Sequence, residues 1–351
     1  MSLTPSNGKP TLAAIARLTG VSTPTVSKVV NGREDVAAET RAKVLAALEE
    51  AGYQSPGQRR TASGTGVVDV VFDSINSNYA STVLSGILDY ASEAGVEVLL
   101  SVTGGLPAAR LDVGRRAQRM LDEGRAGMIV VTSSLTDAHL ASFRRRRIPV
   151  VVIDPLNPPP ADVISVGATN WSGGRAAAEH LLDLGHRRIA YLGGPESAEC
   201  NQARLHGYMS ALMSRGVQVL PDLVIHGKFR TEHGVEGLTK LLSLPEQERP
   251  SAIFAGNDAI AVGVLREARR RGIRVPEDLS LVGFDGTALA EDSVPALTSV
   301  TQPLHDMGRA ALRTVLRQSR GEQIDSHRVE LATQLVVRES TAPRPGIRAG
   351  G

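Results

Sequence analysis

The sequence predicts an α/β core of two doubly wound, parallel-sheet lobes behind a small all-α domain. From residue 67 onward, short apolar runs alternate with helical stretches, an order typical of parallel strands covered by helices on both faces. The runs form two successive series, which indicates two lobes. Residues 11–53 instead repeat apolar residues at helical spacing. A chain of 351 residues is long enough for this organisation.

The segment 11–31 predicts two short helices joined by a tight turn. Thr11 can cap the first helix, Gly20 gives the turn its backbone freedom, and Ser22 or Thr23 can cap the second helix. Pro24 falls in the first turn of that second helix, where its missing N–H costs nothing. The second helix is short, polar outside and basic, as a helix that reads the major groove should be. An ordinary pair of core helices is the less favoured alternative.

The pattern AxxxGVSxxTVSxVVN resembles the DNA-binding signature of the LacI/GalR family. It is carried by Ala16, Gly20, Val21, Ser22, Thr25, Val26, Ser27, Val29, Val30 and Asn31. The run TRAKVLAALEEAGY at 40–53 is similar as well, and the resemblance extends to about Ser340. It implies a core like that of type I periplasmic binding proteins and the function of a transcriptional regulator, most simply a repressor.

The resemblance also implies which residues touch DNA. Contacts to bases fall on Thr23, Pro24 and Lys28, and contacts to phosphates fall on Thr11, Ser22, Thr25 and Asn31. Lysine can reach the acceptors of guanine, while proline offers only apolar contact to a thymine methyl group. A homodimer, or a dimer of dimers, would present two such helices to a near-palindromic operator.

Residues 54–66 are polar, rich in proline and glycine, and unpatterned, which predicts a linker after a flexible lead at 1–10. In the family this linker becomes a hinge helix whose leucine enters the minor groove. Here Arg59 and Arg60 keep positive charge suited to that groove, but Ala62 or Ser63 stands at the leucine position. Because an apolar wedge is missing, we expect weaker kinking of the DNA, or a kink made by other means.

Charge and cysteine content narrow the class of protein. The chain up to Gly66 holds eight basic and five acidic residues, whereas the remainder holds 31 basic and 32 acidic ones. A basic head on a near-neutral body fits DNA binding by one end. The single cysteine, Cys200, excludes an internal disulfide and a multi-cysteine metal site. The start lacks a signal-peptide pattern and no apolar run reaches membrane-spanning length, so we expect a soluble, cytoplasmic protein.

The core at 67–340 is expected to cross between its lobes three times, as in the resembling family. The first series of strands is 67–72, 96–102, 128–132 and 149–154, and the second is 163–167, 188–193, 252–256 and 280–284. Lobe one is predicted at about 67–168 plus 303–325, and lobe two at about 169–300 plus 328–340. The tail at 341–351 is rich in proline and glycine and is predicted to be disordered.

Polar and aromatic residues at the carboxyl ends of strands predict a small-molecule effector site, because open α/β folds bind ligands there. Strand ends give Asp73, Asp154, Asn257 and Asp285, and Tyr79, Trp171 and Phe229 are aromatic residues beside such ends. The resemblance to the LacI/GalR family adds Arg204. The resemblance assigns Arg204, Asn257 and Asp285 to hydroxyl groups of a sugar and Phe229 to its apolar face. Asn257 can equally be a helix cap, and Trp171 can equally be a surface residue.

Other functions find less support. No nucleophile elbow, zinc-binding histidine pair or phosphate-binding glycine loop is present, so neither an enzyme nor a cofactor is expected. The run of arginines at 144–147 ends a helix, where cations favour the helix dipole, and needs no nucleic acid to explain it. A transport-associated sugar-binding protein, or a regulator with a nucleobase or phosphorylated corepressor, stays as the alternative. A sugar or short oligosaccharide is the favoured effector.

Overall fold

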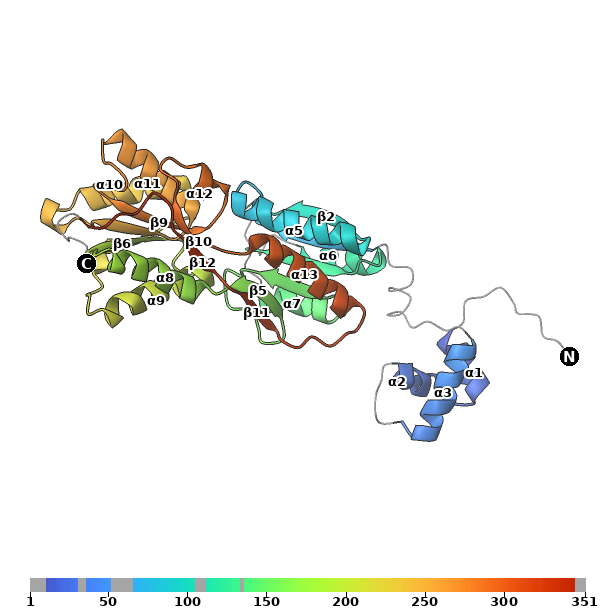
Figure 1. The fold of residues 1–351 in the computed structure, drawn as a ribbon. Coiled ribbons are helices and arrows are strands. Elements are labelled where there is room, and N and C mark those ends of the chain that lie inside the picture. Colours follow the sequence, from blue (N-terminus) through green and yellow to red (C-terminus); the bar gives the residue numbers. More distant parts are fainter. Residues whose placement is uncertain (1–10, 31–35, 52–65, 105–111, 133–135, 345–351) are drawn as a thin grey trace. The chain divides into compact units, whose positions relative to one another are not determined.

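The computed structural model describes residues 11–30, 36–51, 66–104, 112–132 and 136–344. The chain divides into two compact units, a head within residues 1–64 and a core within 65–351 (Figure 1). The predicted lead at 1–10, Asn31, and the hinge residues Arg59, Arg60 and Ala62 lie outside the described residues. Among the described residues, no helix is long and apolar enough to cross a membrane.

The head consists of helices α1 (Leu12–Thr19), α2 (Thr23–Val30) and α3 (Ala38–Glu50). Ile15, Val26 and Val44, one from each helix, are fully buried and form its small core. Gly20 ends α1 with φ of +67°, and its N–H donates to the carbonyl oxygen of Ala16. The predicted turn therefore depends on a backbone conformation that glycine adopts freely.

Lobe one is a parallel sheet with helices on both faces. Its strands are β1 (Val67–Phe72), β2 (Glu97–Val102), β3 (Gly127–Val131), β4 (Val150–Ile153), β5 (Ile164–Ala168) and β11 (Arg328–Leu331), in the order β11-β5-β4-β3-β1-β2. Its helices are α5 (Asn78–Ala94), α6 (Val113–Asp122), α7 (Asp137–Arg144) and α13 (Leu304–Ser319). Helices α5 and α13 cover one face, and α6 and α7 cover the other.

Lobe two repeats this plan. Its strands are β6 (Ile189–Gly193), β7 (Val224–His226), β8 (Ala252–Ala255), β9 (Ser280–Asp285), β10 (Thr298–Thr301) and β12 (Gln334–Val336), in the order β12-β10-β9-β8-β6-β7. Only the pairing of β12 with β10 is antiparallel among the described strands of this sheet. Its main helices are α8 (Asn170–Asp183), α9 (Glu199–Ser214), α10 (Thr231–Leu242), α11 (Asp258–Arg270) and the short α12 (Ala288–Asp292).

Apolar side chains explain the layers of lobe two. Leu181 of α8 and Leu212 of α9 pack against one face of the sheet. Leu238 of α10 and Val264 of α11 pack against the other face. All four side chains are 1% exposed or less. The doubly wound fold predicted from alternating strands and helices is therefore confirmed, as is the all-α head.

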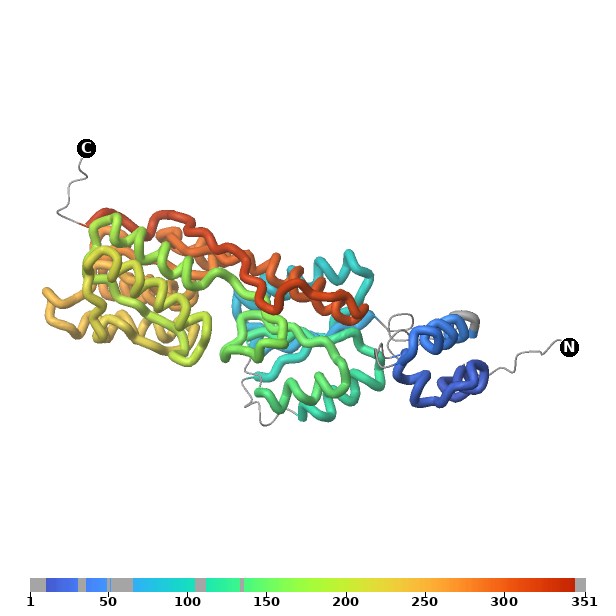
Figure 2. The backbone as a smooth tube through the Cα atoms, turned by 90° about the horizontal axis from the view of Figure 1, so that it is seen from below, coloured from blue at the N-terminus to red at the C-terminus, as the bar shows by residue number. Residues whose placement is uncertain are grey.

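The chain passes between the lobes at three described places: from β5 to α8, from β10 to α13, and from β11 to β12. Figure 2 shows the last part of the chain, in red, running along both lobes. Thr169, at the first crossing, contacts two residues of the third. Its backbone N–H donates to the carbonyl oxygen of Leu331 at 2.9 Å, and its hydroxyl oxygen accepts from Thr333 N at 2.9 Å and lies 3.0 Å from Thr333 Oγ1. The two crossings are thus tied to each other.

Three details of the predicted core and tail differ from the structure. Residues 328–331 were assigned to lobe two, but β11 pairs with β5 in the sheet of lobe one, and the chain crosses only afterwards. The run at 163–167 was counted with the second series of strands, whereas the predicted bounds of lobe one, about 67–168, include it. The pairing of β5 with β4 agrees with those bounds and not with the grouping of strands. The tail was expected to be disordered from residue 341. Instead Ala342 N donates to Ser280 Oγ at 3.0 Å and Arg344 N donates to the carbonyl of Leu184 at 2.9 Å.

Candidate functional site

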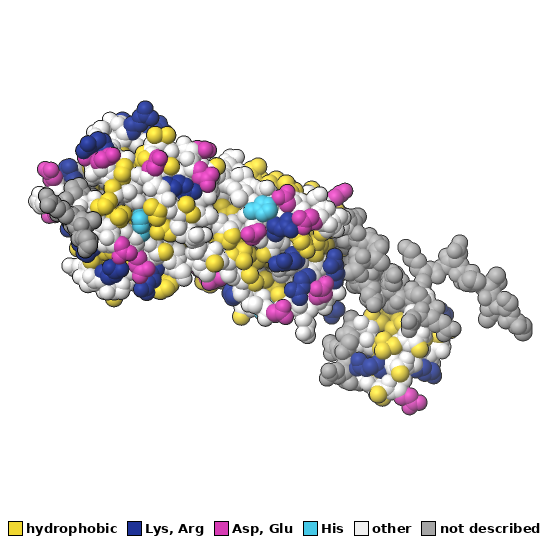
Figure 3. Space-filling model, in the orientation of Figure 1, with side chains coloured by type: hydrophobic (Ala, Val, Ile, Leu, Met, Phe, Trp, Pro, Cys, Tyr) yellow, Lys and Arg dark blue, Asp and Glu magenta, His cyan; other side chains and the backbone are white. Residues whose placement is uncertain are grey.

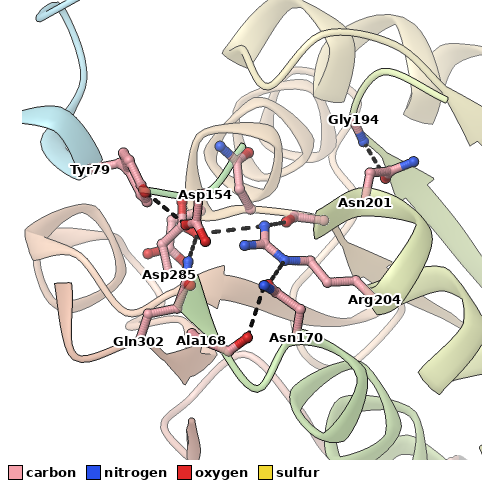
Figure 4. A network of polar contacts seen from close by, with 12 residues as sticks. Tyr79, Asp154, Ala168, Asn170, Gly194, Asn201, Arg204, Asp285 and Gln302 are labelled. Carbon is pink, nitrogen blue, oxygen red and sulfur yellow. Dashed lines mark hydrogen bonds and ion pairs between the residues drawn. The ribbon is translucent and has the colours of Figure 1, made fainter. Parts of the chain in front are cut away.

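Arg204 lies at the centre of a buried polar network at the carboxyl ends of the strands (Figure 4). It projects from α9 and is 3% exposed. Its Nε donates to Asn170 Oδ1 at 2.8 Å, and its Nη1 donates to the carbonyl oxygen of Gly256 at 2.7 Å. The same Nη1 lies 3.6 Å from Asp285 Oδ1. A buried guanidinium needs such partners, and here they come from three separate segments of lobe two.

Two aromatic rings flank the same guanidinium. The Arg204 Cζ lies 3.8 Å from the ring centroid of Phe284 and 5.7 Å from that of Phe229. A cation over an aromatic face is stabilised when both are withdrawn from water. Helix α9 reaches this position because Gly174 lets it approach α8; a Cβ there would stand 2.2 Å from the Arg204 carbonyl oxygen.

Asp285 ends β9 in a conformation that side chains rarely adopt, with φ of +101°. The pKa of its carboxyl is raised to about 7, chiefly by burial; Arg204 opposes the rise and the carboxylate of Asp258 adds to it. Gln302 Nε2 donates to Asp285 Oδ1 at 2.8 Å. Asp285 can therefore gain or lose a proton near neutral pH within a largely fixed surrounding.

Asp258, beside Asn257, supports the loop that follows Asp285. It accepts from Thr287 N at 2.7 Å, from Thr287 Oγ1 at 2.9 Å and from Ser299 Oγ at 2.6 Å. Asn257 itself accepts from Ile260 N at 2.9 Å, so it caps α11. Of the two interpretations of Asn257, capping is thus the one with an observed contact.

Lobe one contributes a second acidic group. Tyr79, at the start of α5, donates its hydroxyl to Asp154 Oδ2 at 2.7 Å. Asp154 follows β4 with φ of +42° and is 5% exposed. Burial raises the pKa of its carboxyl, and burial together with the carboxylate raises the pKa of Tyr79 well above the ordinary value. Asp73, at the end of β1, accepts from Thr103 Oγ1 at 2.9 Å, a contact within lobe one.

A cavity of about 150 Å³ lies where the two lobes join, beside this network. Its walls come from β4 and β5, the crossing into α8, the first turn of α9, and β11. Trp171, which is 44% exposed, lines it and lies under the guanidinium of Arg175 at 5.7 Å. Cys200 also lines it, and burial raises the pKa of its thiol to about 11, so it stays a neutral thiol at ordinary pH.

The structure brings together most of the residues predicted for this site. Tyr79, Asp154, Arg204, Phe229 and Asp285 lie in or against the network, and Trp171 shares the cavity with Asp154. The sequence prediction missed Asn170 and Gln302. Each comes at or just after the end of a strand, so extending the same rule to every polar residue at a strand end would have found them. Among the described residues, no group of three or more ligating side chains could hold a metal ion.

The predicted base contacts lie on α2 of the head. Thr23, Pro24 and Lys28 are exposed on α2. Ser22 Oγ accepts from Thr25 N at 3.3 Å and lies 2.8 Å from Thr25 Oγ1, so Ser22 caps α2. Thr11 likewise caps α1, accepting from Ala14 N at 3.2 Å. The exposed start of α2 is therefore preformed, with its first turn fixed by a side chain.

Comparisons with known proteins agree with this architecture. Residues 11–55 match the family of bacterial regulatory proteins of the lacI type, and residues 178–341 match a periplasmic binding protein-like domain. The catabolite control protein A of Priestia megaterium is 33% identical over 94% of this chain and 99% of its own length. A solved complex of the transcriptional regulator CelR with cellobiose has a TM-score of 0.71 and 33% identity, covering 94% of this chain and 99% of that one. The lac repressor dimer bound to operator and an anti-inducer has a TM-score of 0.68 and 27% identity, covering 95% of this chain and 100% of the other.

A helix-turn-helix head joined to a two-lobed core with a buried polar site defines a ligand-responsive transcriptional regulator, a class distinct from enzymes. The chain belongs to the LacI family of bacterial regulatory proteins. Its core is accordingly the effector-binding domain of that family.

Proposed function

We propose that this chain is a repressor whose affinity for operator DNA is controlled by a sugar or short oligosaccharide bound between the lobes. The observation that carries the proposal is the Arg204–Asp285 network, which lies beside a cavity lined by both lobes. Effector binding changes the arrangement of the lobes and thereby the affinity of the head for DNA. The effector either releases DNA or strengthens its binding.

The chemistry of the site favours a polyhydroxyl ligand. Asp154 and Asp285 offer acceptors, Arg204 offers donors, and Phe229 offers an apolar face that suits the C–H groups of a sugar ring. The similarity to a regulator solved with cellobiose supports the same class of ligand. The full set of effector residues that we propose is Asp73, Tyr79, Asp154, Trp171, Arg204, Phe229, Asn257 and Asp285.

DNA binding is assigned to the exposed face of α2. Thr23, Pro24 and Lys28 would contact bases, and their neighbours at the helix start would bind phosphates through side chains and backbone N–H groups. We expect the change Lys28→Ala to weaken binding to the operator far more than binding to unrelated DNA. Equal losses on both DNAs, measured at one salt concentration, would make Lys28 a phosphate contact instead.

Two copies of the chain are needed to read a near-palindromic operator, and lobe one offers a surface for that contact. Leu99, Leu100 and Val102 on the edge strand β2 are 38–47% exposed, and Leu88 on α5 is 48% exposed. Figure 3 shows hydrophobic side chains, in yellow, exposed on the surface of lobe one. An apolar edge strand left in water invites pairing, and a second copy would cover it.

The test is fluorescence anisotropy of labelled DNA from upstream of the chain's own gene, titrated at fixed salt with and without a panel of sugars. The panel is glucose, galactose, maltose and cellobiose. Tight binding that one sugar weakens or strengthens supports the proposal and identifies the effector. Tight binding that no sugar changes would contradict the sugar assignment and favour a nucleobase or phosphorylated corepressor.

A further inference from the structure

Gln302 is a buried residue that the site prediction did not include. It stands between β10 of lobe two and α13 of lobe one, in the second of the three crossings, and is 3% exposed. Its Nε2 donates to Asp285 Oδ1 at 2.8 Å, and its backbone N–H donates to the Asp285 carbonyl oxygen at 3.0 Å. The crossing is thus attached to Asp285 by both side chain and backbone.

The other side of Gln302 leads into lobe one. Its carbonyl oxygen accepts from Leu304 N, the first residue of α13, at 2.9 Å. Helix α13 packs tightly on α5, where a Cβ on Gly86 would stand 1.9 Å from the carbonyl oxygen of His305. Helix α5 carries Tyr79, which donates to Asp154. A path of hydrogen bonds and of helix packing therefore runs from the acidic group of lobe two to that of lobe one.

The amide oxygen of Gln302 is the unusual feature. Within the part of the chain that the structure describes, no donor lies within hydrogen-bond distance of its Oε1, although the atom is fully buried. Figure 4 shows Asp285 between Gln302 and Arg204, with a contact to each. A buried acceptor without a donor favours any rearrangement that supplies one.

We propose that Gln302 is the positioning residue that couples effector binding at Asp285 to a movement of lobe one. The inference rests on the proposed function and adds the route by which a hydroxyl-bearing effector acts. An effector hydroxyl that donates to Asp285 competes with the Gln302 amide for the carboxylate. The amide then turns, its carbonyl gains a donor, and the crossing shifts the start of α13.

The chain supplies a matched control in Gln318. Its Oε1 is also buried without a hydrogen-bond donor among the described residues, but it lies on α13 inside lobe one, between the crossings. Methionine has the length of glutamine without its amide. The variants Gln302→Met and Gln318→Met therefore remove the same chemistry at two places, only one of which contacts Asp285.

The experiment measures the dissociation constant of the full-length chain for operator DNA without and with saturating cellobiose, with saturation checked by calorimetry. The ratio of the two constants is the coupling, which in allosteric proteins is commonly of the order of 5- to 150-fold. We expect Gln302→Met to bring the ratio to about one at cellobiose concentrations that calorimetry shows to saturate that variant, while Gln318→Met keeps the ratio of the unmodified chain.

The outcomes separate the two proposals. If the unmodified chain responds and Gln302→Met shows the same ratio, Gln302 does not couple the lobes, although the proposed function stands. If both methionine variants lose the ratio equally, the loss reflects general damage and the assignment to Gln302 is wrong. If no sugar of the panel, cellobiose included, changes the DNA affinity of the unmodified chain, the proposed function fails together with the inference.

Discussion

The two lobes share one plan and differ at the ends of their strands. Each has a strand order that places its edge strands in corresponding positions, and each has helices on both faces. In lobe two, the strand ends hold Arg204, Asp258 and Asp285 in a buried network. In lobe one, the described contact to that region is a single pair, Tyr79 with Asp154, whereas the edge strand β2 exposes apolar side chains.

This difference assigns ligand binding mainly to lobe two and contact with a second copy of the chain to lobe one. Lobe two supplies most of the groups that can hold a ligand, and lobe one supplies a second acid and a surface for another copy. A fold alone does not fix where such groups lie, because the strand-end loops vary independently of the sheet. The comparison therefore predicts that changes in the network of lobe two have the largest effects on effector affinity, and that changes on the β2 edge of lobe one act on assembly.

The largest effect is expected from Arg204→Ala. Removing one member of a buried pair leaves Asp285 without its guanidinium, which should destabilise the fold by about 3–5 kcal/mol. The change also removes the charged donors that the proposal assigns to the sugar, so effector affinity should fall by about a hundredfold. Isothermal calorimetry with the sugar found by the panel measures this. Arg215→Ala, which breaks an exposed pair with Asp183 in the same lobe, is the control and should change little.

A large effect on assembly is expected from Leu100→Lys on β2. A charge at an apolar subunit contact should raise the dimer dissociation constant by about thirtyfold, the usual size for an interface residue of high energy. Sedimentation equilibrium reports it. Met213→Lys changes a residue of lobe two that is 69% exposed and should leave assembly unchanged. Equal effects of the two changes would remove the assignment of this edge as the contact.

Effector affinity should depend on pH through Asp285. Its pKa is about 7, raised first by burial, so the carboxyl is mostly protonated at pH 6 and mostly ionised at pH 8. Hydroxyl donors favour the ionised form, and affinity should therefore rise by about tenfold from pH 6 to pH 8. Arg204, Asp258 and Asp154 all act on this pKa. Asp285→Asn should give a flat profile, and a flat profile in the unmodified chain would count against the carboxylate contact.

The raised pKa of Asp285 also affects the stability of the folded chain, which should fall as pH rises whereas effector affinity should rise. Between the ordinary pKa of 3.8 and about 7, the folded chain holds a proton on Asp285 that the unfolded chain has lost. The contribution of this group to the free energy of unfolding therefore falls as pH rises through that range. Denaturant unfolding of the unmodified chain and of Asp285→Asn across pH 5 to 8 separates this contribution from that of other groups.

The smallest effect is expected from Tyr79→Phe in lobe one. The change removes one hydrogen bond to Asp154, worth about 1 kcal/mol, and should weaken effector binding by about fivefold. Tyr90→Phe, on the same helix, provides the control. A loss as large as that of Arg204→Ala would mean that lobe one holds the ligand as firmly as lobe two, contrary to the comparison.

Sequence patterns predicted the elements well where the physics is local. The turn at Gly20 and the cap at Ser22 depend on neighbouring residues alone, and the buried strands reveal themselves as apolar runs. The membership of β11 was not predictable in this way. Its residues alternate between exposed and half-buried, and this pattern does not indicate which of the two sheets the strand joins. Its place in lobe one depends on pairing with β5, which lies more than 150 residues earlier in the chain.

The positions of many site residues were predictable from the sequence, but their contacts were not. Acidic residues at strand ends were found because their positions follow from the topology. Arg204, which lies on α9, was assigned only through the resemblance to the LacI/GalR family. Whether such a residue contacts a ligand or its own backbone depends on rotamers, and Asn257 illustrates this by capping α11. Gln302 was missed because its importance comes from Asp285, a partner that only the folded chain brings within 2.8 Å.

The most direct test of the account measures the affinity of the effector by calorimetry, for the free chain and for the chain saturated with operator DNA. Coupling between two sites is reciprocal, so DNA should change effector affinity by the same factor by which the effector changes DNA affinity. Equal factors, both lost in Arg204→Ala, are the predicted result. An effector that binds the free chain and the DNA complex equally well would contradict control of DNA binding from the site between the lobes.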